Sequence, residues 1–192
     1  MLSITIPAAR PVPPAALFDP EAPVPLANIL SVSPEGHLKW RGKTYRCALG
    51  RAGIAMTKRE GDGATPVGCF NLRRVLYRPE REDAPQTLLA VEAIYEVDGW
   101  CDDPEDPEYN RPVSLPHGAS AEAMWREDSL YDIVVVLGHN DAPVIPGCGS
   151  AIFLHVATPA YAPTEGCIAL AREDLLKIIQ DCDSETQVCV LD

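Results

Sequence analysis

The feature of this sequence that most constrains its fold is a series of short, continuous apolar runs near the C-terminus. YDIVVVLG at residues 131–138 ends in glycine, SAIFLHVA lies at residues 150–157, and CIAL at residues 167–170 is a third, shorter run. Continuous apolar runs of this length, bounded by turn residues, are typical of strands that are buried on both faces. We therefore expect these runs to form the buried strands of a β-sheet core.

The rest of the chain predicts more strands and little helix. Strands are predicted at residues 28–33, 36–40, 43–50, 69–77 and 186–191, and loops at residues 59–68 and 98–118. Helices are predicted at residues 119–127 and 172–182, the second with acidic residues in its first turn. The predicted fold class is mainly β with one or two short helices, as a β-sandwich or a partly open barrel.

The composition predicts one domain preceded by an arm. Residues 1–27 are rich in proline and alanine and predict an extended N-terminal arm, whereas residues 28–192 are long enough to bury one substantial core. The N-terminal stretch lacks the basic start and the continuous apolar segment of a secretion signal. No stretch approaches the roughly 20 apolar residues of a membrane helix, so we expect no membrane span.

The charge balance and the cysteine pattern narrow the classes of partner. Sixteen basic and 28 acidic residues give a net charge of −12, which argues against nucleic acid and anionic membranes, because both bind basic surfaces. The seven cysteines include no C-x-x-C pair, so a structural zinc site is not expected, and most should be small core side chains. We expect neither a metal nor another cofactor.

One histidine and one cysteine form a candidate catalytic pair. His155 interrupts the apolar run 150–157, and Cys167 follows Gly166 at the start of the next run. A cysteine nucleophile needs a nearby base, and the intervening prolines and glycine turn would return the chain beside His155. Gly166 permits a tight turn, so that the backbone N–H of Cys167 can approach an oxyanion. The alternative is that both side chains are ordinary core residues.

At these residues the chain resembles a known family. HVATPAYAPTEGCIAL at residues 155–170 resembles the catalytic signature of the L,D-transpeptidases (YkuD-type domain), a strand histidine followed by a Ser/Thr-x-Gly-Cys turn. KREGDGATPVGCF and PGCGSAIFLH also resemble stretches of that domain, and the resemblance covers roughly residues 38–192. It departs at Glu165 and Ala169, where many members have histidine and arginine.

The resemblance implies a cofactor-free enzyme acting on peptidoglycan stem peptides. Cys167 would attack the carbonyl between diaminopimelate and D-alanine of a stem tetrapeptide, and His155 would move the proton. The thioester would pass to an amine of a second stem, either the diaminopimelate side chain (3-3 crosslink) or the N-terminal L-alanine (1-3 crosslink). The alternatives are an L,D-carboxypeptidase that transfers to water and a non-catalytic module that binds cell-wall peptide.

The same resemblance implies an inhibitor class and a location. Carbapenem-type inhibitors are expected to acylate Cys167. The chemistry belongs in the periplasm or the cell wall, while the lack of a visible signal peptide keeps the cytoplasm as an alternative.

Six further residues are candidates for contacts with the stem peptide: His139, Arg111, Trp100, Tyr131, Glu165 and Thr164. Arg111 is a candidate carboxylate clamp, and Trp100 and Tyr131 are candidate walls of the cleft. Each has a simpler interpretation, namely surface charge for Arg111, a loop anchor for Trp100, a turn residue for His139 and a solvated side chain for Glu165.

Overall fold

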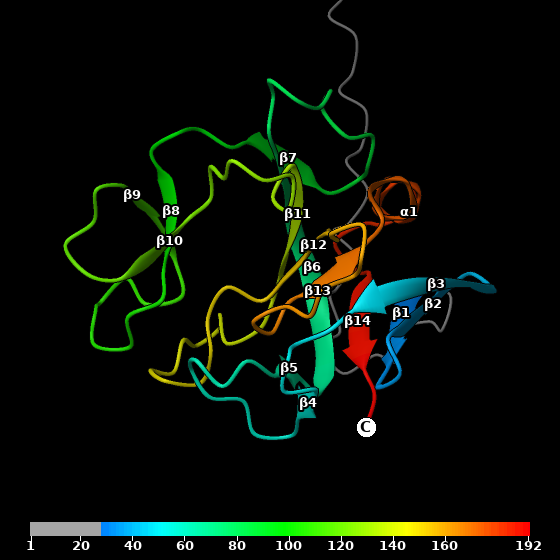
Figure 1. The fold of residues 1–192 in the computed structure, drawn as a ribbon, viewed down its shortest axis with the longest axis horizontal. Coiled ribbons are helices and arrows are strands. Elements are labelled where there is room, and N and C mark those ends of the chain that lie inside the picture. Colours follow the sequence, from blue (N-terminus) through cyan, green and yellow to red (C-terminus); the bar gives the residue numbers. More distant parts are fainter. Residues whose placement is uncertain (1–27) are drawn as a thin grey trace, which may run out of the picture.

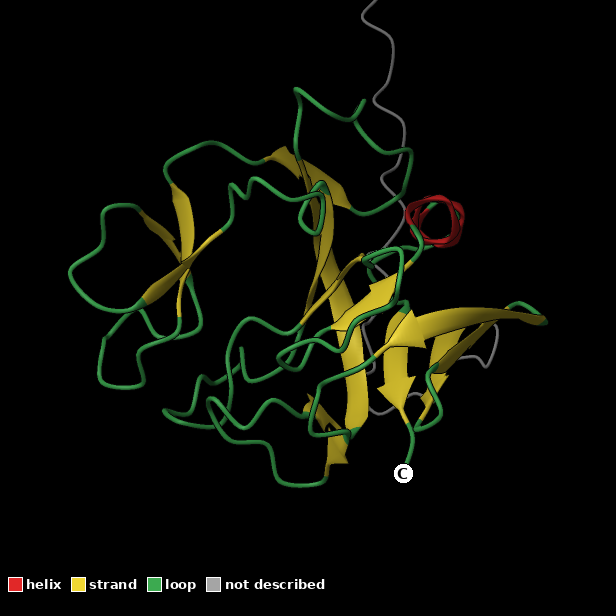
Figure 2. Cartoon of the chain, viewed as in Figure 1, coloured by secondary structure: helices red, strands yellow, loops and turns green. Residues whose placement is uncertain are grey.

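The computed structural model describes residues 28–192, so the arm predicted for residues 1–27 lies outside the described residues. The fold is mainly β with one short helix, which confirms the predicted fold class (Figures 1 and 2). The elements are β1 Ile29–Ser33, β2 His37–Trp40, β3 Lys43–Ala48, β4 Ile54–Ala55, β5 Thr65–Pro66, β6 Gly68–Tyr77, β7 Ala90–Ala93, β8 Asp98–Cys101, β9 Pro112–Ser114, β10 Ala121–Ala123, β11 Ile133–Leu137, β12 Phe153–Val156, β13 Ile168–Leu170, α1 Arg172–Ile179 and β14 Gln187–Val190.

The largest sheet closes on itself like a barrel. Its strand order is β11-β12-β13-β3-β2-β1-β14-β6-β7, and a further pairing of β11 with β6 joins the two ends of the first eight strands. The strand β6 makes this closure because it is ten residues long: its first half pairs with β14 and its second half with β11. Closure leaves few unpaired strand edges in the part of the sheet that carries the core.

The apolar runs are continuous because the strands are buried on both faces. Along β11, Ile133, Val135 and Leu137 belong to the main core, while Val134 and Val136 belong to a second core on the other face of the sheet. The helix α1 covers the main core with Leu175, Ile178 and Ile179, which lie on one side of the helix. The alternation of β11 side chains between the two cores is expected of a central strand, because successive side chains of a strand point to opposite faces of the sheet.

A second, three-stranded sheet corrects the prediction for residues 98–127. It has the order β10-β8-β9 and lies to one side of the main sheet (Figure 1). The predicted helix at residues 119–127 is wrong, since residues 121–123 form β10 and pair with β8. The predicted loop 98–118 contains β8 and β9. Pairing along the strand edge outweighs the weak local helix preference of this alanine-containing stretch.

The cysteines are mostly buried, as expected, and two of them pair. Cys69 and Cys189 face each other on β6 and β14 and form a disulfide. Cys47, Cys101, Cys167 and Cys182 are buried thiols, and Cys148 is half-buried. Separately, a search of the described residues finds no helix with the length and apolarity to cross a bilayer.

Candidate active site

His155 and Cys167 lie on the same face of two neighbouring strands. The strands β12 and β13 pair in parallel, with His155 opposite Ala169. Cys167 precedes Ala169 by two positions, so its side chain points to the same side of the sheet as that of His155. Both residues line one cavity of about 610 Å³. The pairing of β12 with β13 thus joins the two residues that the sequence singled out.

The wall of this cavity comes from four separate parts of the chain. The strands β12 and β13 supply His155 and Cys167, and the loop before β13 supplies Pro163, Thr164 and Glu165. Lys58, Glu60 and Gly61 come from the glycine-rich segment before β5. Asp102, Glu122, Arg126 and Tyr131 come from the three-stranded sheet and the segment that leads into β11. Cationic and anionic side chains therefore face the same space.

Hydrogen bonds fix the turn that presents Cys167. Thr164 Oγ1 donates to the Cys167 carbonyl at 2.7 Å and accepts from the Gly166 N–H at 3.2 Å. The Thr164 N–H donates to the Leu49 carbonyl at 2.9 Å, which ties the turn to the end of β3. Gly166 has φ +137°, and a Cβ there would lie 2.9 Å from the Ala64 carbonyl oxygen. The turn therefore requires glycine at this position.

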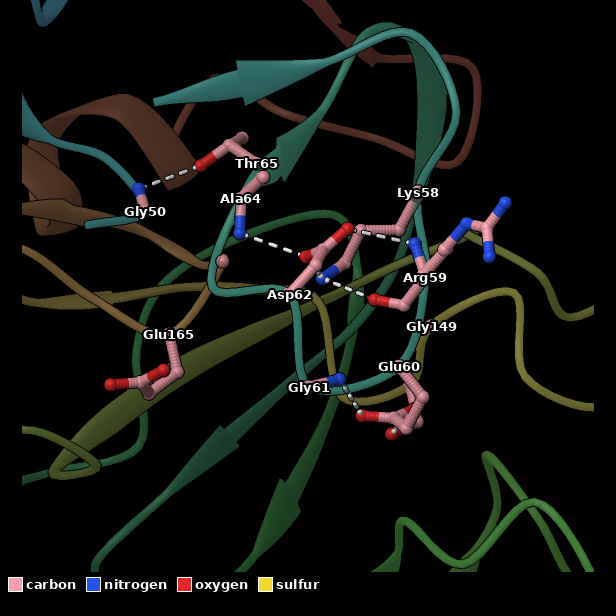
Figure 3. Close-up of polar contacts among 12 residues, drawn as sticks. Gly50, Lys58, Arg59, Glu60, Gly61, Asp62, Ala64, Thr65, Gly149 and Glu165 are labelled. Atoms are coloured by element: carbon pink, nitrogen blue, oxygen red, sulfur yellow. Dashed lines mark hydrogen bonds and ion pairs between the residues drawn. The ribbon is translucent and has the colours of Figure 1, made fainter. Parts of the chain in front are cut away.

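The glycine-rich segment packs directly over the turn and places a lysine beside it. Asp62 accepts hydrogen bonds from the N–H groups of Arg59 and Ala64 and forms an ion pair with Lys58 (Figure 3). The Lys58 side chain is only 6 % exposed, and its Nζ lies 3.5 Å from where a Cβ of Gly166 would be. Lys58 is a site residue that sequence reasoning missed, although it begins the KREGDGATPVGCF stretch on which the resemblance rests.

Burial determines the resting protonation of the pair. Burial lowers the pKa of His155 from its ordinary value of 6.5 to about 4. Burial, with the nearby charge of Glu122, raises the pKa of the Cys167 thiol to about 12, and Lys58 opposes this rise. At neutral pH the pair is therefore an uncharged thiol and an uncharged imidazole. The thiol donates to the Ala151 carbonyl at 3.1 Å.

The uncharged imidazole is oriented as a base. His155 Nδ1 lies 2.9 Å from the Val156 carbonyl oxygen, so this nitrogen carries the proton and Nε2 is left as the acceptor. The Tyr131 ring packs edge-on against the imidazole, with 5.4 Å between ring centroids, and its hydroxyl donates to Glu122 Oε1 at 2.7 Å. The site thus holds an imidazole with a fixed tautomer and an uncharged thiol at the same cavity.

This protonation state predicts a pH dependence of stability. The pKa of His155 is lower in the folded protein than in the unfolded chain, so only the unfolded chain takes up this proton between about pH 6.5 and pH 4. The free energy of unfolding should fall as the pH falls through this window, by up to about 3 kcal/mol from this residue. Urea denaturation between pH 7.5 and pH 4 measures it. A His155→Gln variant, which cannot titrate, should lose less stability; an equal loss in both proteins would contradict the burial argument.

The other predicted site residues separate into two groups. Tyr131, Thr164 and Glu165 line the cavity with Cys167. The Glu165 side chain is 76 % exposed and is paired with Arg51 at 2.8 Å. The segment that carries Glu165 also lies beside the glycine-rich stretch (Figure 3).

Trp100, Arg111 and His139 line a neighbouring cavity of about 210 Å³ and do not line the one that contains Cys167. Burial lowers the pKa of His139, whose Nε2 lies 3.0 Å from the Cys148 carbonyl oxygen. The Trp100 indole donates to Asn110 Oδ1 at 3.0 Å and packs edge-on against Phe153. Their contact with a substrate remains a prediction.

The set of side chains that best resembles a metal centre lies elsewhere in the described chain. It consists of Cys101, Asp106 and His117, none of which lines the cavity at Cys167. The chemistry that the cavity itself supports is nucleophilic attack by a thiol with imidazole as the proton acceptor.

One family model matches most of this chain. The model of the L,D-transpeptidase catalytic domain (YkuD) matches residues 31–190. A search of curated proteins finds no match. Among solved structures, the helical cell shape determining protein Pgp2 from Campylobacter jejuni is similar, with a TM-score of 0.43 and 17 % identity over 85 % of this chain and 47 % of that one. The present chain spans about half the length of that protein. From the family match over most of its length, this chain belongs to the L,D-transpeptidase catalytic domain (YkuD) family.

Proposed function

We propose that this domain is a peptidoglycan L,D-transpeptidase that uses Cys167 as the nucleophile and His155 as the general base and acid. The observation that carries the proposal is the placement of both residues on one sheet face, at one cavity, in a chain of this family. Gly166 supports the turn beside the oxyanion position, where the backbone N–H of Cys167 would stabilise the developing charge. The domain boundaries proposed are residues 28–192 for the catalytic domain and 1–27 for the arm.

The proposed first half-reaction forms a thioester. The Cys167 thiol gives its proton to His155 Nε2 while the sulfur attacks the carbonyl carbon between diaminopimelate and D-alanine. The C–N bond then breaks, and His155 returns the proton to the amine of the departing D-alanine. Because both resting groups are uncharged, we propose that proton transfer accompanies attack on a bound substrate rather than preceding it.

The proposed second half-reaction passes the acyl group to an amine of another stem. The amine attacks the thioester carbon and gives its proton to His155, the C–S bond breaks, and His155 returns the proton to the departing sulfur, which restores the thiol. Charges of both signs in the cavity suit such substrates: Lys58 and Arg126 for carboxylates, and Glu60, Asp102 and Glu122 for an ammonium group. We propose the diaminopimelate side chain or the N-terminal L-alanine as the acceptor, action in the periplasm or cell wall, and inhibition by carbapenems.

Product analysis tests the proposed function. Purified protein is incubated with disaccharide-tetrapeptide together with sugar-free tetrapeptide, whose N-terminal L-alanine amine is free, and the products are identified by mass spectrometry with fragmentation. A dimer that has lost one D-alanine is expected, and the fragment masses then distinguish a 3-3 from a 1-3 crosslink. Tripeptide without dimer would replace the proposal with an L,D-carboxypeptidase. If the tetrapeptide remains intact while it binds, the proposal of an enzyme is overturned.

A further inference from the structure

A second chemically distinct cluster lies in the three-stranded sheet, outside the proposed active site. The Cys101 sulfur, a carboxylate oxygen of Asp106 and a ring nitrogen of His117 all lie within 4.8 Å of one another. Cys101 ends β8 and is fully buried, while Asp106 and His117 are half-buried and come from the segments before and after β9. Three separate points of the chain thus bring a thiol, a carboxylate and an imidazole together.

The spacing of the nitrogen and the oxygen fits a shared ion better than a hydrogen bond. His117 Nε2 and Asp106 Oδ2 are 3.4 Å apart, and this buried nitrogen has no hydrogen-bond partner among the described residues. A buried polar atom without a partner is costly, and a bound ion or water is one way to satisfy it. Two ligand atoms each about 2.0–2.1 Å from a tetrahedral ion lie about 3.4 Å apart, which is the separation found here.

The surrounding backbone holds the cluster in place. Asp106 Oδ1 accepts the Glu108 N–H at 2.7 Å, which leaves Oδ2 turned towards His117. The Cys101 N–H donates to the Arg111 carbonyl and its carbonyl accepts from the Asn110 N–H, both at 2.9 Å. Such second contacts orient metal ligands in known sites. These hydrogen bonds hold the Cys101 backbone and the Asp106 carboxylate in place.

The charge of this region favours a divalent cation. Asp102 and Asp103 follow Cys101 directly in the sequence, and the Asp106 carboxylate lies within 4.8 Å of the Cys101 sulfur. Arg111 is a nearby cation in sequence, but its side chain is exposed and lines the cavity of His139. A mixed set of sulfur, nitrogen and oxygen ligands is typical of zinc, whereas calcium and magnesium take oxygen ligands.

We propose that Cys101, Asp106 and His117 bind a zinc ion that holds the three-stranded sheet together, with water in the fourth position. The ion would link the end of β8 to the loops on both sides of β9 and so close two loops of the chain. The sequence does not predict this site, because its single cysteine, Cys101, is not part of a C-x-x-C pair.

The proposed ion has a structural route to the active site. Asn110, hydrogen-bonded to the backbone of Cys101, donates through Nδ2 to the carbonyls of His139 and Asn140 at 3.0 and 2.8 Å. Its Oδ1 accepts the Ala151 N–H at 3.1 Å, and the Ala151 carbonyl accepts the Cys167 thiol. Loss of the ion should therefore loosen one wall of the cavity without removing a catalytic group.

Zinc titration of the full chain tests the proposal. Protein treated with a chelator and then freed of it is titrated with Zn²⁺ against a chromophoric competitor, and one equivalent is expected to bind. Cys101→Ser, Asp106→Asn and His117→Gln should each weaken binding by at least about 10-fold. The matched controls Cys148→Ser and His37→Gln, which change a thiol and an imidazole outside the cluster, should bind as the parent does.

Two further measurements keep the proposal falsifiable if a variant folds poorly. Co²⁺ bound to the parent protein should give a thiolate-to-metal charge-transfer band. The Cys148→Ser protein should give the same band, and the Asp106→Asn protein should bind Co²⁺ more weakly. Zinc should also raise the melting temperature of the parent protein. Failure of the parent to bind one equivalent, or a cobalt complex without thiolate charge transfer, overturns the zinc site and leaves the proposed transpeptidase function untouched.

Discussion

Replacement of Cys167 with alanine is expected to abolish dimer formation while the fold persists. Removal of the sulfur removes the proposed nucleophile, and alanine cannot form a thioester, so the rate should fall by at least about 10⁴-fold. Cys167 is buried but small, and loss of its sulfur should cost about 1 kcal/mol of unfolding free energy. Dimer formation followed by mass spectrometry and urea denaturation measure the two effects.

Cys182→Ala is the matched control for this prediction. Cys182 is also buried, and its thiol donates to the Ile178 carbonyl at 3.1 Å, as the Cys167 thiol does to Ala151. It belongs to the main core and does not line the cavity, so its replacement should affect stability only. A carbapenem should add its mass to the parent and to Cys182→Ala, and not to Cys167→Ala. Dimer formation by a folded Cys167→Ala protein would contradict the assignment of the nucleophile.

The second large effect is expected for Gly166→Ala, which adds one methyl group beside the proposed nucleophile, Cys167. The backbone at φ +137° is unfavourable for alanine, and the new Cβ would lie 2.9 Å from the Ala64 carbonyl oxygen. Either the turn or the glycine-rich segment must move. We expect a loss of about 2 kcal/mol or more in unfolding free energy. The rate of the folded fraction should fall by about 10²-fold or more, because Cys167 is displaced.

Gly68→Ala separates backbone strain from this specific contact. Gly68 has φ +138°, nearly the same as Gly166, but its Cβ would meet only the tip of the Phe70 ring at 3.2 Å. That ring can shift more easily than a backbone carbonyl, and Gly68 does not line the cavity. The Gly68→Ala protein should be destabilised by the strain and keep its rate per folded molecule. Equal loss of rate in both variants would show that the Ala64 contact is not what positions Cys167.

The sequence predicted the parts of the fold that depend on local pattern. The runs at residues 131–138, 150–157 and 167–170 were recognisable as central strands because both of their faces are apolar. The helix from Arg172 was recognisable from its single apolar side. In contrast, the residues of β10 by themselves predict a helix, because the strand character of β10 comes from pairing with β8 and is not visible in its own residues.

The candidate site shows the same division. The polar His155 in an apolar strand and the Gly166–Cys167 turn were visible in the sequence, and a proline-containing loop suggested that they return to each other. The burial of Lys58 beside the turn was not visible, because it depends on how the segment 58–65 folds over residues 164–167. The separation of His139 from the cavity at Cys167 was not visible either, because a residue at a strand end can face either side of the sheet.

By itself, the sequence determined a mainly β domain and singled out Cys167 and His155 as the candidate pair, because alternation and turn residues act over a few neighbouring positions. Only the tertiary structure decided which distant groups meet: Cys69 with Cys189, Lys58 with the turn at Gly166, and Cys101 with Asp106 and His117. The physical reason is that these contacts arise from sheet closure and strand pairing, which depend on the packing of the whole core and leave no periodic signal in the residues that meet.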